Sequence, residues 1–407
     1  MASPLPTLQS GTTIDHVQTL KMASPLPTLQ SGTTTIDNVG EDLLQNIVAR
    51  LPALSFASVA CVSRSWNLVC SRILCRPKLS SACSFNPSLH LAVAEVVAEV
   101  LSQPIRPHFA IASVGPSFSR LEAYELITAK LGSKVPLVTN CSSGIIGRDV
   151  LSHEFKEWKV TEEDDDLLED NDDMEGTNKA IMLVVGFLPG MKVGTIPLLK
   201  QYDEACPCAV KIDKFITDIR EFSTSISGCT SPAAIIMFCS SILSFVLDCA
   251  MSPETVIVGD CCCYFIHASK SSRNIAPRYE RVPAGVALYF LDNQETLLVN
   301  GVGINTGDTF RVYHPHSTTS LSSVANVSDH MRSFKQGSTN GGDRLEVVGG
   351  LIFASVGRGE SFFGQPNVDS SPFLENFPDV ALGGMLCARE IGRGNLSPYV
   401  KESEEQK

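Results

Sequence analysis

Short apolar runs alternate with segments of helical periodicity between residues 108 and 266, and this alternation constrains the fold more than any other feature. The runs are rich in Val, Ile, Ala and Phe, as buried strands are. They cover residues 108–115, 135–147, 179–190, 233–240 and 254–266. Residues 119–132 and 213–226 instead repeat their apolar positions as a helix does. Strands that alternate with helices pack in layers, so we predict an α/β fold here, with 135–147 a strand that breaks into a glycine-containing turn.

Residues 233–251 have the length of a membrane span and contain only one charge, Asp248. Ser240, Ser241 and Ser244 interrupt the apolar character, and no Lys or Arg lies close to either end. A buried strand followed by a buried helix over 241–251 explains the segment better. We therefore expect no membrane partner.

From about residue 284 the pattern becomes mainly β. Apolar runs separated by Gly- and Asn-rich turns cover residues 286–292, 309–314, 345–355 and 380–388. We predict an α/β region over 105–283 and a mainly β portion over 284–392. A polar tail over 393–407 follows.

One acidic run dominates the charge of the chain. The net charge is −12, and residues 162–175 contain ten carboxylates with no Lys or Arg. Like charges repel and none of them can be buried, so we predict a solvated loop over 161–176. Neither this run nor the near-neutral remainder offers the concentrated positive charge that binds phosphate backbones. We expect no nucleic-acid partner.

The cysteines indicate reduced thiols rather than disulfides or a metal site. The N-terminus lacks a secretory apolar core, so we expect the 14 cysteines to belong to a cytoplasmic or nuclear protein. Cys206, Cys208, Cys261–Cys263 and His267 do not form the CxxC or HxxxH pairs of metal sites. We expect no metal and no cofactor.

Residues 1–35 contain a duplicated segment, because residues 1–13 recur unchanged at 22–34. The repeated residues are rich in Pro, Ser, Thr and Gly. We predict a disordered leader.

Residues 36–80 are helical by pattern. Asn38 can cap a helix that has Glu41 as its third residue. The apolar residues on one face of this helix are Leu43, Leu44, Ile47, Val48 and Leu51. Pro52 ends it, and Ser55 can cap a second helix with an apolar face of Val59, Val62, Trp66 and Val69. Periodicity alone fits two possibilities equally: a helical pair that binds a partner, or a small module packed on its own domain with Trp66 in its core.

The order of the residues in this segment resembles the F-box. The matching residues are Asp42, Leu43, Leu44, Ile47, Leu51, Pro52, Val59, Cys61, Val62, Ser63, Arg64 and Trp66. The resemblance implies a three-helix F-box over 36–80 that binds the Skp adaptor of a cullin–RING ubiquitin ligase. It also implies an adaptor-facing or supporting set of Val39, Leu43, Leu44, Ile47, Leu51, Pro52, Val59, Val62 and Trp66.

Four later segments resemble FIST domains (F-box and intracellular signal transduction). They are residues 138–147, 355–359, 362–369 and 380–392. The resemblance implies a FIST N-like domain over 105–283 and a FIST C-like domain over 284–392. It also implies that this region binds a ligand, or recruits a substrate, in signal transduction.

The residues of these segments allow a pocket, which we centre on Arg358. Its guanidinium can bind a carboxylate or a phosphate with two hydrogen bonds. The candidate lining is Arg358, Asn367, Asp369, Gly383, Gly384, Cys387 and Glu390. The alternative is that the glycines make hairpins and Arg358 pairs with a nearby acid.

Three functions follow from these observations. The first is a non-catalytic substrate receptor of a Skp–cullin–F-box (SCF) ubiquitin ligase, which recruits an unidentified protein for ubiquitination and proteasomal degradation. The second is a small-ligand sensor whose FIST pocket regulates that recruitment. The third is an enzyme that uses Cys387 or an Arg358-centred site, but Cys387 has no evident His base, and no P-loop or nucleophile elbow occurs. We therefore expect no enzymatic activity within the chain.

Overall fold

The structure is a computed structural model of the chain. It describes residues 40–160, 178–197, 208–239, 247, 250–261, 287–290, 297–300, 316–337, 346–388 and 390–393. The predicted leader, the acidic run and the polar tail from residue 394 onward lie outside these ranges. So do Asn38 and Val39.

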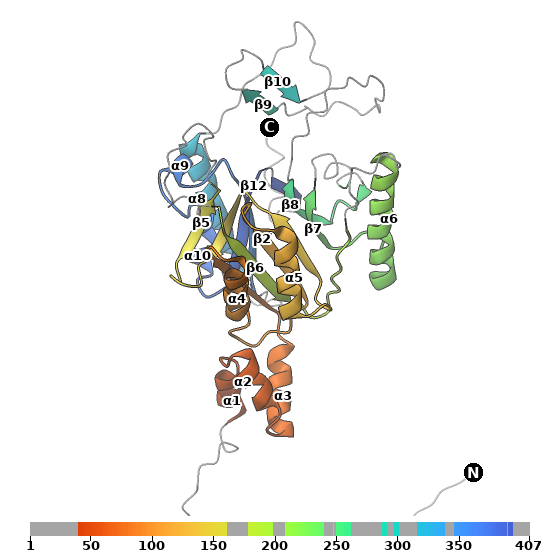
Figure 1. Cartoon of the computed structure of the whole chain (residues 1–407), viewed down its shortest axis with the longest axis vertical. Helices are drawn as coiled ribbons and strands as arrows, with labels where there is room; N and C mark the ends of the chain where they lie inside the picture. Colours follow the sequence, from red (N-terminus) through yellow and green to blue (C-terminus); the bar gives the residue numbers. More distant parts are fainter. Residues whose placement is uncertain are drawn as a thin grey trace, which may run out of the picture.

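Three short helices form a separate group at one end of the molecule (Figure 1). They are α1 (Glu41–Val48), α2 (Ala53–Ala60) and α3 (Arg64–Leu74), and we call residues 41–74 the helical module. Their apolar sides enclose a core of Leu44, Val48, Phe56, Trp66, Val69 and Cys70. Ser63 caps α3, because its hydroxyl accepts a hydrogen bond from the Trp66 amide at 3.3 Å. The predicted cap at Ser55 is wrong, since α2 already begins after Pro52.

The first sheet follows the module directly, and we call the described residues from Lys78 onward the body. The sheet has the order β1-β6-β2-β3. Its strands are β1 (Lys78–Ser84), β6 (Ile181–Phe187), β2 (Phe109–Val114) and β3 (Leu137–Cys141). β2 and β3 are parallel, whereas β6 is antiparallel to β1 and β2. Residues 78–80 therefore belong to a strand, and the helical pattern predicted over 36–80 ends earlier.

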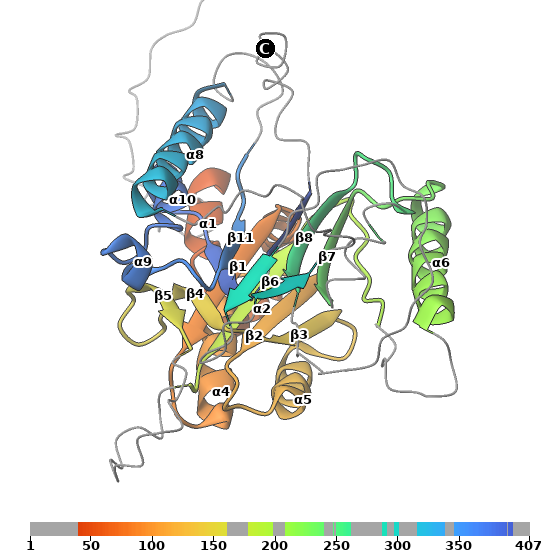
Figure 2. The ribbon, with the colours of Figure 1, turned by 90° about the horizontal axis from the view of Figure 1, so that it is seen from above.

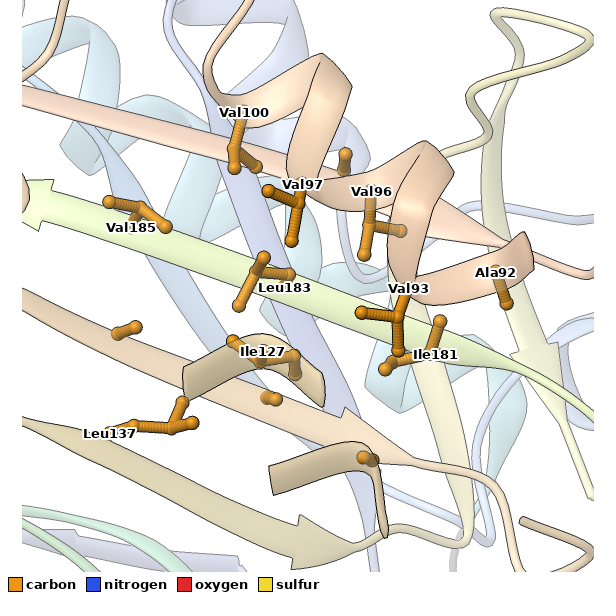
Figure 3. Close-up of a cluster of buried hydrophobic side chains, with 14 of the residues drawn as sticks. Ala92, Val93, Val96, Val97, Val100, Ile127, Leu137, Ile181, Leu183 and Val185 are labelled. Carbon is orange, nitrogen blue, oxygen red and sulfur yellow. The ribbon is translucent and has the colours of Figure 1, made fainter. Parts of the chain in front are cut away.

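Helices α4 (Leu89–Val100) and α5 (Arg120–Leu131) cover one face of this sheet. Figure 3 shows the α4 side chains Val93, Val96 and Val97 directed toward Ile181 and Leu183 of β6. Alternate residues of a strand face opposite sides of a sheet. Met182 and Val184 accordingly lie in a second core on the other face of the sheet.

That second core joins the first sheet to another with the order β11-β12-β4-β5. Its strands are β11 (Gly350–Ser355), β12 (Leu382–Cys387), β4 (Gly144–Arg148) and β5 (Phe155–Lys159). The Ser81 hydroxyl also donates a hydrogen bond to the Leu382 carbonyl across the two sheets, at 2.8 Å. The prediction of a turn at the end of 135–147 is wrong in part, because residues 144–148 resume as strand β4 and are buried up to Gly147.

A third sheet lies beside these layers, with the order β13-β8-β7. Its strands are β13 (Glu390–Arg393), β8 (Val256–Cys261) and β7 (Ala234–Cys239). The long helix α6 (Cys208–Ser227) lies beside it (Figure 2). Phe215, Ile216 and Ile219 of α6 share a buried core with Met237 and Ile257 of the sheet. Strands β9 (Ala287–Phe290) and β10 (Leu297–Asn300) form a separate antiparallel pair. Most of the helix predicted over 241–251 lies outside the described residues.

The prediction of a mainly β portion over 284–392 is wrong in one respect. Residues Ser317–Gly337 form the 21-residue helix α8, and two short helices follow, α9 (Glu360–Phe363) and α10 (Ser371–Asn376). α8 is rich in Ser and Thr and has few large apolar residues, so its helical period is weak in the sequence.

The C-terminal strands complete sheets that begin much earlier in the chain. β12 pairs with β4, and β13 pairs with β8. The predicted boundary at residue 284 therefore does not separate two independent sets of strands. The whole is a mixed α/β architecture with a helical module at its N-terminal side. Among the helices that the structure describes, none is both long enough and apolar enough to cross a membrane.

Candidate functional site

The predicted adaptor-binding residues divide into a buried group and an exposed group. Leu44 and Trp66 are only 8% and 9% exposed, and Leu51 and Val59 pack partly buried against the same core. Leu43, Ile47 and Val62 are instead 58%, 50% and 62% exposed, and Pro52 is exposed as well. The buried group supports the module from inside. The exposed group is the one available to a partner.

Helix α1 presents Leu43 and Ile47 on its outer side. Residues four apart lie on the same face of a helix, one turn apart. Glu41 forms an ion pair with Arg72 of α3, so a different side of α1 faces α3. Leu43 and Ile47 therefore form an apolar pair in which each side chain is at least half exposed.

Leu68 of α3 is a further exposed apolar residue, with 60% exposure, that the sequence did not indicate. It lies two positions after Trp66, out of step with the buried residues Val69 and Cys70. The spacing of Leu68 in the sequence could have predicted its exposure. An apolar residue that does not share the helical spacing of the buried residues faces solvent or a partner.

Arg358, in the second predicted site, is bound by Asp369. The guanidinium donates from Nε to both carboxylate oxygens at 2.9 and 3.0 Å, and from Nη2 to Oδ1 at 2.5 Å. It also lies over the ring of Phe363, 4.9 Å from the centroid. The hydrogen bond to Asp369 raises the pKa of Arg358, so the charge persists. Arg358 therefore pairs with a nearby acid, which was the alternative to a ligand pocket.

Asn367 binds the edge of β5, the outermost strand of the second sheet. Its Oδ1 accepts from the Glu157 amide at 3.2 Å, and its Nδ2 donates to the Phe155 carbonyl at 3.2 Å. Its φ is 58°, a left-handed conformation that asparagine tolerates better than most residues. Asn367 thus satisfies an amide and a carbonyl of the β5 backbone. Without it, both groups would be free to pair with another strand.

Glu157 belongs to the same cluster, although the sequence did not indicate it. Its Oε1 accepts a hydrogen bond from the Ser370 amide at 2.7 Å, whereas Oε2 is buried without a hydrogen-bond partner. Burial raises the pKa of Glu157, and the nearby carboxylate of Asp369 raises it further, although the hydrogen bond from Ser370 opposes this. The hydrogen bonds of this cluster hold residues 358–370 against β5, so its role is structural.

Replacing Glu157 with glutamine should stabilise the fold at neutral pH. The folded pKa of Glu157 is raised, so the unfolded chain releases this proton first as pH increases, and the folded state loses stability between the two pKa values. We expect Glu157→Gln to melt at a higher temperature than wild type at pH 7. The difference should disappear below pH 4.5, the ordinary pKa of the group. Glu154→Gln, at an exposed site on the same hairpin, is the control, and equal melting temperatures at pH 7 would contradict the assignment.

The other predicted pocket residues lie mainly within the packed sheets. A side chain at Gly383 would meet Val184 of the first sheet at 2.7 Å, and one at Gly384 would meet the Ile352 carbonyl at 2.2 Å. Cys387 is fully buried at the end of β12. Glu390 is exposed, and its charge reaches Arg358. The structure therefore brings together Arg358, Asn367 and Asp369, with Glu390 near them, whereas the two glycines allow close packing.

Gly384→Ala should destabilise the chain irrespective of any ligand. The added methyl group would overlap the Ile352 backbone, and overpacking of this kind costs about 1–3 kcal/mol or more. Gly392→Ala in β13 is the matched control, because a side chain there meets nothing within 4 Å. Urea unfolding should show a lower midpoint for the first variant alone. An unchanged midpoint for Gly384→Ala would mean that the glycine is free to serve a pocket.

Metal binding finds no support in the part of the chain that the structure describes. There, no group of three or more His, Cys, Asp or Glu side chains is arranged to hold an ion. Cys206, Cys262, Cys263 and His267 lie outside the described residues. The apolar outer face of the helical module thus stands as the most distinct candidate site.

Comparison with known proteins identifies a family match that contains the helical module. The family model of the F-box domain matches residues 36–77. A protein of Arabidopsis thaliana named F-box/LRR-repeat protein is 32% identical over an alignment of 487 positions with its gaps, and the alignment covers 91% of this chain and 89% of that protein. A leucine-rich repeat is one strand–helix unit repeated many times. The strands described in the present chain instead form several distinct sheets.

Proposed function

The chain belongs to the family of F-box proteins, and on this basis we propose that it is a substrate-recognition subunit of an SCF ubiquitin ligase. The helical module docks the Skp-type adaptor, and the cullin–RING scaffold joins through that adaptor. The chain supplies no catalytic group of its own. Ubiquitin transfer belongs to the assembled ligase.

The observation that carries this proposal is the exposed pair Leu43 and Ile47 on a module whose core is well packed. Large apolar side chains that stay exposed on an ordered surface mark interaction sites. Recognition between helices depends on a few such anchors that become buried in the partner. Trp66 and Leu44 keep the presenting helices in place from within.

We propose that the body recruits the target and that residues 105–392 form a FIST-type region. Three of the four FIST-like segments contribute strands: residues 138–147 contain most of β3 and of β4, residues 380–392 contain β12 and most of β13, and residue 355 ends β11. This supports one continuous region rather than two separable FIST domains. A ligand-sensing role has no observation in its favour among the described residues.

A comparison of two tagged chains in cells tests the proposed function. Wild type should co-purify with the adaptor, with a cullin and with proteins that carry ubiquitin. The double variant Leu43→Asp/Ile47→Asp should retain the captured proteins, since the body is unchanged, but should lose the adaptor, and those proteins should lose their ubiquitin and increase in amount. Equal ubiquitination of captured proteins with both chains would overturn the proposal.

A further inference from the structure

Strand β7 is an outer strand of the third sheet, on the far side of β8 from β13 (Figure 2). β7 and β8 are parallel, and the Val256 amide of β8 donates to the carbonyl of Ala233, just before β7, at 3.0 Å. In a strand of a parallel pair, the amide and carbonyl of one residue point to the same side, and those of the next residue point to the other side. The residues of β7 that direct both groups away from β8 are therefore Ala234, Ile236 and Phe238.

This outer edge of β7 has the features of a strand that can accept another. Among the described residues, none forms a hydrogen bond with the outward amides and carbonyls of β7. Proteins commonly protect such edges with charged side chains or proline. The outer strand β5 contains Lys156, Glu157 and Lys159, and the outer strand β13 contains Glu390 and Arg393. β7 (AIIMFC) contains neither a charge nor a proline, so it lacks both kinds of protection.

The side chains beside this edge are apolar and accessible. Ala234 lies opposite Val256 in the register, and Ile236 follows two residues later on the same face of the sheet. Ala234 is exposed, and Ile236 and Val256 are 37% and 39% exposed. The other face differs, because Met237 and Ile257 are buried there in the core shared with α6. An added strand would therefore extend an apolar surface on the exposed face while its backbone paired with β7.

We propose that the body holds its protein target by β-strand addition at β7. The occupant is an extended, uncharged segment of the target, as long as the six residues of β7, with an apolar side chain at every second position. In such complexes the backbone hydrogen bonds supply affinity and the alternate side chains supply specificity. A charged segment would lose hydration on this uncharged edge without gaining an opposite charge. The inference rests on the proposed function, because it names the surface on which the proposed substrate receptor takes its target.

The variant Ile236→Pro removes the outward amide at the middle of the edge. Proline is tolerated on an outer strand where its nitrogen faces away from the sheet, and its ring would block the approach of a further strand. Ile236→Thr is the matched control, since it reduces the same apolar side chain but keeps the amide and the β-branched shape. Ala234→Pro, at the first residue of β7, blocks the same edge a second time. Circular dichroism and melting temperature show which of the full-length variants are folded, and the folded ones are compared.

The tagged full-length chains are captured from cells in which the proteasome is inhibited. Each should co-purify with the same amount of adaptor. Wild type and Ile236→Thr should carry the same ubiquitinated proteins, identified by mass spectrometry, whereas the proline variants should retain about tenfold less of them or lower. The most strongly depleted protein is then purified and mixed with purified wild type. Amide hydrogen exchange at Ala234, Ile236 and Phe238 should become slower in that complex.

Equal capture of those proteins by wild type and the proline variants, or unchanged exchange in the purified complex, would overturn the added strand. A loss as large with Ile236→Thr would also overturn it, because the contact would then depend on the side chain rather than on the backbone. A wild-type chain that elutes as a dimer, with Ile236→Pro as a monomer, would assign the edge to a second copy of the chain instead. Absence of the adaptor from wild type would overturn the proposed function, whereas failure of β7 alone leaves adaptor binding unchanged.

Discussion

Replacing Leu43 and Ile47 together with aspartate should abolish binding to a purified Skp-type adaptor while the chain stays folded. Both side chains are at least half exposed, so their loss removes little from the core of the module. Anchors of an interface contribute about 2 kcal/mol or more each. Losing about 4 kcal/mol weakens binding roughly a thousandfold, and two carboxylates placed in an apolar contact weaken it further. Calorimetric titration of the adaptor into each chain measures the effect.

The control for this experiment is a pair of equally exposed leucines on the body. Leu121 and Leu151 are 69% and 70% exposed, and both lie outside the helical module. Leu121→Asp/Leu151→Asp carries the same added charge and should bind the adaptor as wild type does. If Leu43→Asp/Ile47→Asp also bound with wild-type affinity, the outer face of α1 would have no part in docking.

Trp66→Ala should unfold the helical module while the body remains folded. Trp66 is one of the six residues of the buried core of the module, and truncation of a buried tryptophan costs about 3–5 kcal/mol. A core this small has little stability to lose. We expect amide hydrogen exchange in residues 41–74 to become fast and adaptor binding to disappear, with residues 89–131 as protected as in wild type. Protection of 41–74 equal to wild type would contradict the role of Trp66.

These two experiments separate contact from support, which the sequence alone does not do. Leu43 and Leu44 are adjacent, both are leucine, and the F-box resemblance includes both. Only the packing of α1 against α3 decides that Leu44 is 8% exposed and Leu43 is 58% exposed. Aspartate at Leu44 would also abolish binding, but by unfolding the module.

The layered architecture could be predicted because apolar periodicity is a local property. The strands at 109–114 and 181–187 and the helices at 120–131 and 208–227 lie where the pattern placed them. Helix α8 was missed because its partly buried positions include serines, whose burial depends on neighbours distant in the chain. The pairing of β12 with β4 joins residues more than 200 positions apart, which no local pattern reveals.

The candidate pocket could not be predicted for the same reason: its contacts join residues that lie far apart in the chain. Gly359 has a positive φ of 103°, a conformation that favours glycine. Whether a glycine lines a pocket or accommodates a neighbour depends on what faces it, and at Gly384 that is the backbone of Ile352 on a different strand. Glu157 gave no signal, because its burial arises only when residues 367–370 fold against β5.

Gel filtration of the purified full-length chain with a Skp-type adaptor and a cullin is the most direct test that this F-box protein is an SCF subunit. Wild type should elute with both partners in one complex at equal stoichiometry, and the cullin should join only when the adaptor is present. The Leu43→Asp/Ile47→Asp variant should elute alone. A wild-type chain that elutes apart from a functional adaptor would contradict the assignment.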